Sequence, residues 1–509
     1  MLTLGEKPLR LQDIYDVAVK YEKVELSPDG REKIGRSHKF LRSEIESGKP
    51  MYGVNTGFGL LSDVSIPAED LETLQYNLIR SHACGAGELL DDIYSRAMLL
   101  LRANALVAGY SGVSVKLVEH VLTLLNRGVC PLIPSQGSVG ASGDLAPLAH
   151  LALVLIGEGR ARVKGEEMSG AAALRAAGLK PIRLGPKEGL SLINGTQFMT
   201  SLGVLGLLEA EQLAYIADIC GAMTLEAMRG TEKAFEPEIQ ELRPHPGQIM
   251  VADRIRSLLL TGGFKSEIAK SHENCGKVQD PYSIRCIPQV HGASRDAMRF
   301  VRDVLEREVN SVTDNPLVFP GDCKKAGKIL SGGNFHGQIV AIAMDLLSIA
   351  ASELASISEQ RIEKLVNPVI SGLPPFLAAH GGLNSGFMIV QVAAASIVSE
   401  NKTLCHPASV DSIPTSADKE DHVSMGAWGA RKALQVIKNV RRVIAMELLA
   451  SCQAIEFLRP LRTSAFLEKI HHIVRKKIPK LDTDRSLYDD IAALETMIEN
   501  REFKLEGLL

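Results

Sequence analysis

The triplet Ala141-Ser142-Gly143 is the segment of this sequence with the least ordinary chemistry. If its loop is held tightly, the amide nitrogen of Gly143 can attack the carbonyl carbon of Ala141. Loss of two waters, one of them from the Ser142 hydroxyl, would then leave a 4-methylideneimidazol-5-one ring. That reaction needs a residue of little bulk, then a hydroxyl that can be eliminated, then an unhindered amide. The triplet therefore has the residue types for a carbon electrophile that no standard side chain provides.

An ordinary structural role competes with this chemistry. Ser142 and Asp144 precede an apolar segment, LAPLAHLALVL, and such residues commonly cap helices, while Pro147 suits a first helical turn. On these residues alone capping is the better explanation, because short motifs recur by accident. A helix that begins at Asp144 would also direct positive dipole potential at the electrophile.

Long helices are expected to position these loops. The segment 338–366 has no internal Gly or Pro and is followed by Asn367-Pro368, which predicts one helix of roughly 45 Å. Further helical segments are expected at about 92–126, 197–228 and 428–458, and small hairpins at 160–164 and 317–330. The predicted fold class is mainly α, with a loop-rich region over 1–195 and a long-helix bundle with C-terminal helices over 196–509. Such rods would expose much apolar surface alone, so we expect a homo-oligomer.

The composition indicates an ordinary globular protein. The chain has 509 residues, 45% hydrophobic and 23% charged, with a net charge of −3, which favours neither nucleic acid nor an anionic membrane as a partner. The N-terminus lacks the apolar core of a signal peptide, and no uninterrupted apolar run is long enough for a bilayer, so we expect a cytoplasmic protein. The eight cysteines form no Cys-x-x-Cys pair and there is no His-Glu-x-x-His. We expect free thiols and no metal site.

The segment GSVGASGDLAPLAH resembles the prosthetic-group motif of the histidine, phenylalanine and tyrosine ammonia-lyase family. Six further segments resemble family motifs in the family's order: YGVNTGFG at 52–59, SHACGAG at 81–87, LINGTQ at 192–197, QDPYSIRC at 279–286, GGNFH at 332–336 and EDHVSMG at 420–426. The resemblance implies a fumarase/aspartase-like helical fold and a homotetramer with active sites shared between subunits. It also implies elimination of ammonia from an amino acid by an electrophile formed autocatalytically from Ala141-Ser142-Gly143, with no external cofactor.

The same resemblance implies roles for individual residues. Tyr52 resembles the base that removes a proton from the substrate β-carbon; a free phenol has a pKa near ~10, so this role needs nearby positive potential. Arg285 resembles the clamp for the substrate carboxylate, since its planar fork suits bidentate binding. Tyr282 resembles the tyrosine beside the prosthetic group. Asp144, which follows the triplet in the same motif, is also expected among the catalytic residues.

Three other residues resemble parts of the pocket wall. Asn194 and Gln279 resemble the amides that hold the ring carbonyl and neighbouring groups, although structural hydrogen bonding would explain them equally well. Phe335 resembles an aromatic wall residue, with simple core packing as the alternative.

The expected substrate is L-histidine. Ser81-His82 resembles the pair found in the histidine enzymes, and His82 could hydrogen-bond an imidazole but not a phenyl ring. Glu420 points the same way, because phenylalanine enzymes have glutamine there; a solvated charge run is the alternative. Gly337-Gln338-Ile339 departs from the histidine pattern, and Lys419 replaces a common glutamine. A tyrosine or phenylalanine ammonia-lyase, or a 2,3-aminomutase, therefore remains an alternative.

Overall fold

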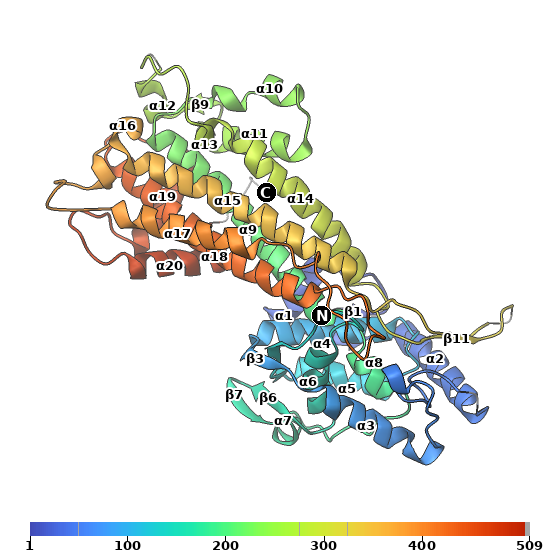
Figure 1. Cartoon of the computed structure of the whole chain (residues 1–509). Coiled ribbons are helices and arrows are strands. Elements are labelled where there is room, and N and C mark those ends of the chain that lie inside the picture. The colour runs from blue at the N-terminus through green and yellow to red at the C-terminus, as the bar shows by residue number, and fades with distance from the viewer. Residues whose placement is uncertain (49, 274, 323, 504–509) are drawn as a thin grey trace. The chain divides into compact units, whose positions relative to one another are not determined.

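The computed structural model of the protein describes residues 1–48, 50–273, 275–322 and 324–503. It is mainly helical, with 58% of residues in helices and 8% in strands, as the sequence predicts. Figure 1 labels the elements along the chain. None of the seven cysteines within the described residues forms a disulfide; Cys323 lies outside them.

The chain divides into two compact units. The first comprises Met1–Leu205, Arg302–Asp345 and Pro407–Arg431, and the second Gly206–Val301, Leu346–His406 and Lys432–Leu509. The first unit contains the whole of the loop-rich region expected over 1–195. The boundaries fall within four long helices, α9 (Gln197–Ala227), α14 (Ile287–Glu308), α15 (Gln338–Val366) and α18 (Gly426–Glu456), and after α17 (Met388–Leu404).

The first unit is built from short helices and small sheets. Its helices are α1 (Leu11–Ala18), α2 (Pro28–Glu46), α3 (Leu71–His82), α4 (Asp92–Val107), α5 (Val115–Asn126), α6 (Leu145–Leu155), α7 (Gly170–Ala176) and α8 (Glu188–Ile193), with 3-10 turns η1 (Gly59–Leu61) and η2 (Ala68–Asp70). A parallel pair joins β1 (Leu2–Leu4) to β2 (Val24–Leu26). The other strands pair antiparallel: β3 (Ala86–Leu89) with β5 (Pro134–Gln136), β6 (Arg160–Val163) with β4 (Val129–Pro131) and β7 (Glu166–Ser169), and β10 (Leu317–Phe319) with β11 (Lys328–Leu330). Both expected hairpins are thus confirmed.

The single helical segment expected over 92–126 is wrong, because α4 and α5 are separate helices. Between them Gly109 and Gly112 have φ of +80° and +72°, a conformation that ends a helix and favours glycine. A Cβ at Gly109 would lie 2.8 Å from the backbone of Lys33. The break therefore comes from a close tertiary approach to α2.

The second unit contains the remaining elements. These are α10 (Pro237–Glu241), α11 (Pro246–Leu259), α12 (Glu267–Ser271), α13 (Tyr282–Arg285), α16 (Pro368–Ser371), α19 (Ala465–Lys477), α20 (Tyr488–Glu499), the 3-10 turns η3 (Glu232–Phe235) and η4 (Pro375–Leu377), and the hairpin of β8 (Leu260–Thr261) and β9 (Phe264–Lys265). Polar side chains connect its long helices. Arg361 of α15 and Glu447 of α18 form a fully buried ion pair at 2.5 Å, and Thr224 of α9 donates to the same carboxylate at 2.8 Å. A buried pair this well satisfied fixes which helix faces meet.

The long helices match their predicted ranges closely. α15 covers 338–366 as expected, and α9 and α18 differ from expectation by one to two residues at their ends. Within the described residues α15 is the one helix long and apolar enough to cross a membrane by length and composition, which the sequence expectation overlooked. Because 61% of its most apolar window is buried, the same hydropathy is explained by packing in a protein core.

Candidate active site

The loop before α6 is held against a second turn of the chain at Gly143 and Gly195. Gly143 has φ +76°, and a Cβ there would lie 2.2 Å from the carbonyl oxygen of Gly195. The next amide, that of Asp144, donates to the same oxygen at 2.7 Å. Only glycine fits this contact, so the triplet is compressed between α6 and the turn that follows α8.

The capping explanation for Asp144 does not hold. Asp144 occupies the N-cap position of α6, but its side chain accepts no hydrogen bond from the amides of that helix. Its fully buried carboxylate instead accepts from the Ser138 hydroxyl at 2.9 Å and from the amide of Met199 at 3.0 Å. Burial raises its pKa to about 7, against the opposing effect of these hydrogen bonds. Asp144 thus fixes the loop through these hydrogen bonds, and it does not line the cavity over Ser142.

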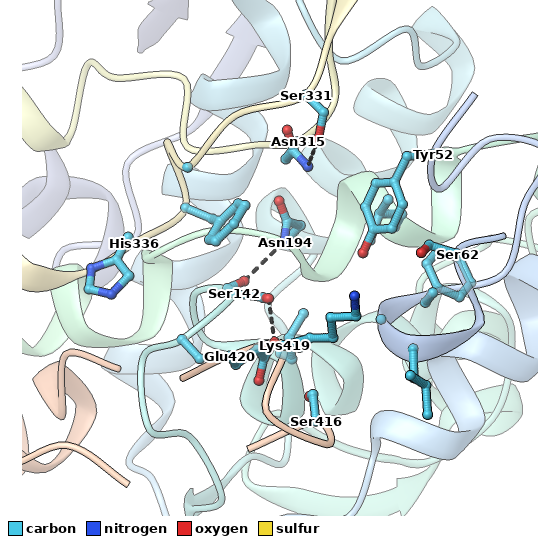
Figure 2. Close-up of a pocket in the computed structure, with 18 of the residues that line it drawn as sticks. Tyr52, Ser62, Ser142, Asn194, Asn315, Ser331, His336, Ser416, Lys419 and Glu420 are labelled. Atoms are coloured by element: carbon cyan, nitrogen blue, oxygen red, sulfur yellow. Dashed lines mark hydrogen bonds between the residues drawn. The ribbon is translucent and has the colours of Figure 1, made fainter. Parts of the chain in front are cut away.

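A cavity of about 1020 Å³ opens over Ser142. Five other residues expected at the site line it with Ala141 and Ser142: Tyr52, His82, Asn194, Phe335 and Glu420. Figure 2 shows Tyr52, Asn194 and Glu420 on separate segments around Ser142, with the hydroxyl of Tyr52 pointing inward.

Two polar side chains contact Ser142 directly. The Nδ2 of Asn194 donates to the Ser142 carbonyl oxygen at 3.0 Å, and the Ser142 hydroxyl donates to Glu420 Oε1 at 2.6 Å (Figure 2). Burial opposes ionisation of Glu420, but hydrogen bonds from Ser142 and Thr415 outweigh it and lower the pKa of this carboxyl. Glu420 therefore carries a negative charge at neutral pH, and the solvated-run alternative is excluded.

His82 ends α3 and is more than half buried. Burial lowers its pKa, opposed by its hydrogen bond to Leu78 and by the charge of Glu420, so the ring is neutral at pH 7. Its Nδ1 lies 2.8 Å from the Leu78 carbonyl oxygen. A carbonyl only accepts, so the proton sits on Nδ1 and the Nε2 lone pair is left to accept a hydrogen bond.

Tyr52 is placed by the glycines that follow it. Gly53 has φ +67°, and a Cβ there would lie 2.5 Å from Leu190 of α8. The Tyr52 ring meets Phe58 edge-on, with centroids 6.5 Å apart. The glycine-rich segment 52–59 thus folds back on itself and on α8.

Some residues of the cavity were not anticipated. Asn315 and Ser331 line it, and the Asn315 Nδ2 donates to the Ser331 hydroxyl at 3.1 Å (Figure 2). Lys419 also lines it, although the sequence had marked this residue only as a departure from the family. The sequence could have indicated Asn315 only through its position directly before Pro316 and ahead of the GGNFH segment.

Gln279, Tyr282 and Arg285 belong to the second unit and do not line this cavity. Tyr282 is 71% exposed, and the Arg285 guanidinium lies 4.6 Å from its ring centroid. Gln279 lines a smaller cavity of about 370 Å³. The expected carboxylate clamp and the electrophile therefore belong to different units of the chain.

The chain is similar to known proteins over almost its whole length. A family model described as aromatic amino acid lyase matches residues 9–476. The histidine ammonia-lyase of Anaeromyxobacter dehalogenans is 53% identical over 99% of both chains, and that of Sorangium cellulosum is 53% identical over 97% of this chain and 96% of its own.

Solved structures show the same similarity. Histidine ammonia-lyase from Trypanosoma cruzi superimposes with a TM-score of 0.90 at 43% identity, covering 100% of this chain and 96% of its own. Tyrosine aminomutase from Streptomyces globisporus gives a TM-score of 0.92 at 36% identity, covering 99% and 97%.

Proposed function

The chain belongs to the aromatic amino acid lyase family, and we propose that it eliminates ammonia from L-histidine to give trans-urocanate. It is a carbon–nitrogen lyase. The full-length relatives that are about half identical to it are histidine ammonia-lyases. The assignment of L-histidine as the substrate rests on one observation: a neutral hydrogen-bond acceptor at His82 and an ionised Glu420 line the same cavity.

Ala141-Ser142-Gly143 fits the prosthetic group typical of this family. The Gly143–Gly195 contact leaves no room for a side chain and presses the triplet into a tight turn. The carbonyl oxygen that would belong to the closed ring is that of Ser142, and Asn194 already donates to it. When formed, the 4-methylideneimidazol-5-one ring supplies an electrophile for the substrate amine, which makes ammonia a better leaving group.

The chain's own residues then have distinct tasks. Asn194 directs an N–H at the oxygen that gains negative charge, as an oxyanion-hole donor does. Tyr52 faces the same space and removes the β-proton. Glu420 holds its negative charge beside Ser142, where it attracts the ammonium or the imidazole of the substrate.

His82 provides selectivity for the imidazole. A substrate ring N–H can donate to the Nε2 of His82, whereas a phenyl ring offers this partly buried acceptor no partner. A site built to hydrogen-bond a substrate group rejects analogues that lack it.

A second copy of the chain completes the site in this proposal. Arg285 is required to bind the substrate carboxylate, and it does not line the cavity. Helix α17 exposes Ile389 and Val392, which lie one turn apart with exposed fractions of 62% and 52%. These apolar side chains support burial in a homotetramer with shared active sites.

The test is to incubate the purified protein with L-histidine and follow the ultraviolet absorbance of urocanate, with L-tyrosine and L-phenylalanine in parallel. We expect urocanate and ammonia in equal amounts from L-histidine. A β-amino acid product would contradict the lyase assignment in favour of an aminomutase. Faster turnover of L-tyrosine than of L-histidine would contradict the substrate.

A further inference from the structure

Arg102 on α4 is fully buried and ends at the turn that carries Asn194. Its Nη1 donates to the Asn194 carbonyl oxygen at 2.5 Å and to Gln197 Oε1 at 3.2 Å. A Cβ on Gly195 would lie 2.8 Å from the same nitrogen. The backbone of the turn therefore packs directly on the guanidinium.

The other end of α8 is fixed in a similar way. Lys187 precedes the helix, and its Nζ lies 2.8 Å from Asp314 Oδ2 and 2.8 Å from the Ser191 hydroxyl. The side chains of Lys187 and Asp314 are both fully buried. Buried charged contacts therefore hold α8 at both of its ends. This helix contacts Gly53, the residue after Tyr52, and it ends at Asn194.

The side chain of Asn194 depends on this support. Its Nδ2 makes the bond to the Ser142 oxygen, but its Oδ1 is buried without a hydrogen-bond partner among the described residues. No second hydrogen bond therefore holds the amide in place. The direction of the Nδ2 donor is set by the backbone at position 194, which Arg102 holds.

We propose that Arg102 is a positioning residue that acts through Asn194 to aim the Nδ2 donor at the Ser142 carbonyl oxygen. The inference deepens the proposed function and rests on it, because that oxygen is the one expected to gain charge during the reaction. A donor displaced by about 1 Å costs on the order of a hundredfold in rate. Arg102 contacts neither the cavity nor Ser142, so its effect passes through the turn.

The chain provides a matched control in Arg96. It lies on the same helix, is 1% exposed, and donates to three backbone carbonyls, those of Val17, Ala18 and Leu125. None of these belongs to the cavity lining. Arg102→Lys and Arg96→Lys each keep the buried charge and remove the planar fork of a buried arginine on the same helix.

The two variants are compared by intact mass, ultraviolet difference spectrum, thermal unfolding and steady-state kinetics. Intact mass counts the chains that have lost two waters, so that kcat is expressed per matured chain. For Arg102→Lys we expect kcat on L-histidine to fall about tenfold to a hundredfold with KM changed by less than about threefold. The absorption band of the conjugated carbonyl should also shift, because its hydrogen bond changes. Arg96→Lys should leave both the spectrum and kcat unchanged.

Equal kcat and equal spectra in the two variants would overturn the inference. If Arg102→Lys fails to fold, Gln197→Met removes the second acceptor of Nη1, together with the hydrogen bond from Gln197 Nε2 to the Thr313 hydroxyl. A smaller fall in kcat with a shift in the same direction is then expected. An unchanged Gln197→Met protein would then overturn it. Absence of the two-water loss in the unaltered protein would instead refute the proposed function, which keeps the two failures distinct.

Discussion

Replacing Asn194 with alanine should remove the donor to the Ser142 oxygen while leaving the chain folded. Asn194 is 4% exposed, and its Nδ2 bond of 3.0 Å is the side-chain contact that links α8 to the triplet. The Arg102 bond goes to its backbone oxygen and would persist. The change is therefore confined to the amide group.

The expected magnitude follows from the role of that donor. Removing one donor from an oxyanion hole lowers kcat by about 10²–10³, equivalent to about 3–4 kcal/mol of transition-state stabilisation. Because the Nδ2 group contacts Ser142 and not the substrate side chain, KM for L-histidine should change by less than about threefold.

The assay is urocanate formation per matured chain, with maturation counted by intact mass. Asn104→Ala is the control, since Asn104 donates to the Val309 carbonyl at 2.8 Å and does not line the cavity. It should lose some stability and retain kcat. A kcat of Asn194→Ala within about threefold of that of the unaltered protein, well short of the loss expected for such a donor, would exclude this role for Asn194.

Three further predictions concern the loop, its clamp and the selectivity residue. Gly143→Ala places a Cβ 2.2 Å from the Gly195 oxygen, so the chain should keep its full mass and show no activity; two-water loss at the normal extent would contradict this. Asp144 has a folded pKa of about 7, above its value of about 4 in an unfolded chain, so its contribution to stability declines as pH rises from about 4 to about 7. The thermal midpoint of the unaltered protein minus that of Asp144→Asn should therefore decrease between pH 5 and pH 8, and a constant difference would count against the burial of a charge there. His82→Leu should lower the preference for L-histidine over L-phenylalanine, as the ratio of kcat/KM values, by about tenfold or more, and an unchanged ratio would remove His82 from substrate recognition.

The fold was predictable where local patterns decide it. α15 has the predicted bounds because its periodic apolar segment has no internal Gly or Pro and meets Asn367-Pro368. The sequence did not predict the break between α4 and α5, because Gly109 is required by its close contact with Lys33, which lies far away in the sequence. The spacing of apolar residues indicates which face of a helix is buried, but it carries no information on contacts between segments that are distant in the sequence.

The site was predictable by type but not by contact. The resemblance assigned Glu420 to the chemistry, yet its bond to the Ser142 hydroxyl joins residues 278 positions apart, and no spacing rule predicts that. Asp144 looked like a helix cap because its neighbours in sequence suit one; its acceptors are instead satisfied by Ser138 and Met199. Arg102 had a weak signal, an arginine within the apolar segment LLRANAL, where a buried charge requires partners.

We expect Ala141-Ser142-Gly143 to cyclise without another protein. The most direct measurement is the intact mass of the purified full-length chain beside that of Ser142→Ala. The unaltered, active chain should be lighter than its sequence by two waters. Ser142→Ala, which has no hydroxyl to eliminate, should not show this loss and should be inactive. A full unmodified mass in freshly purified, active protein would contradict the cyclisation.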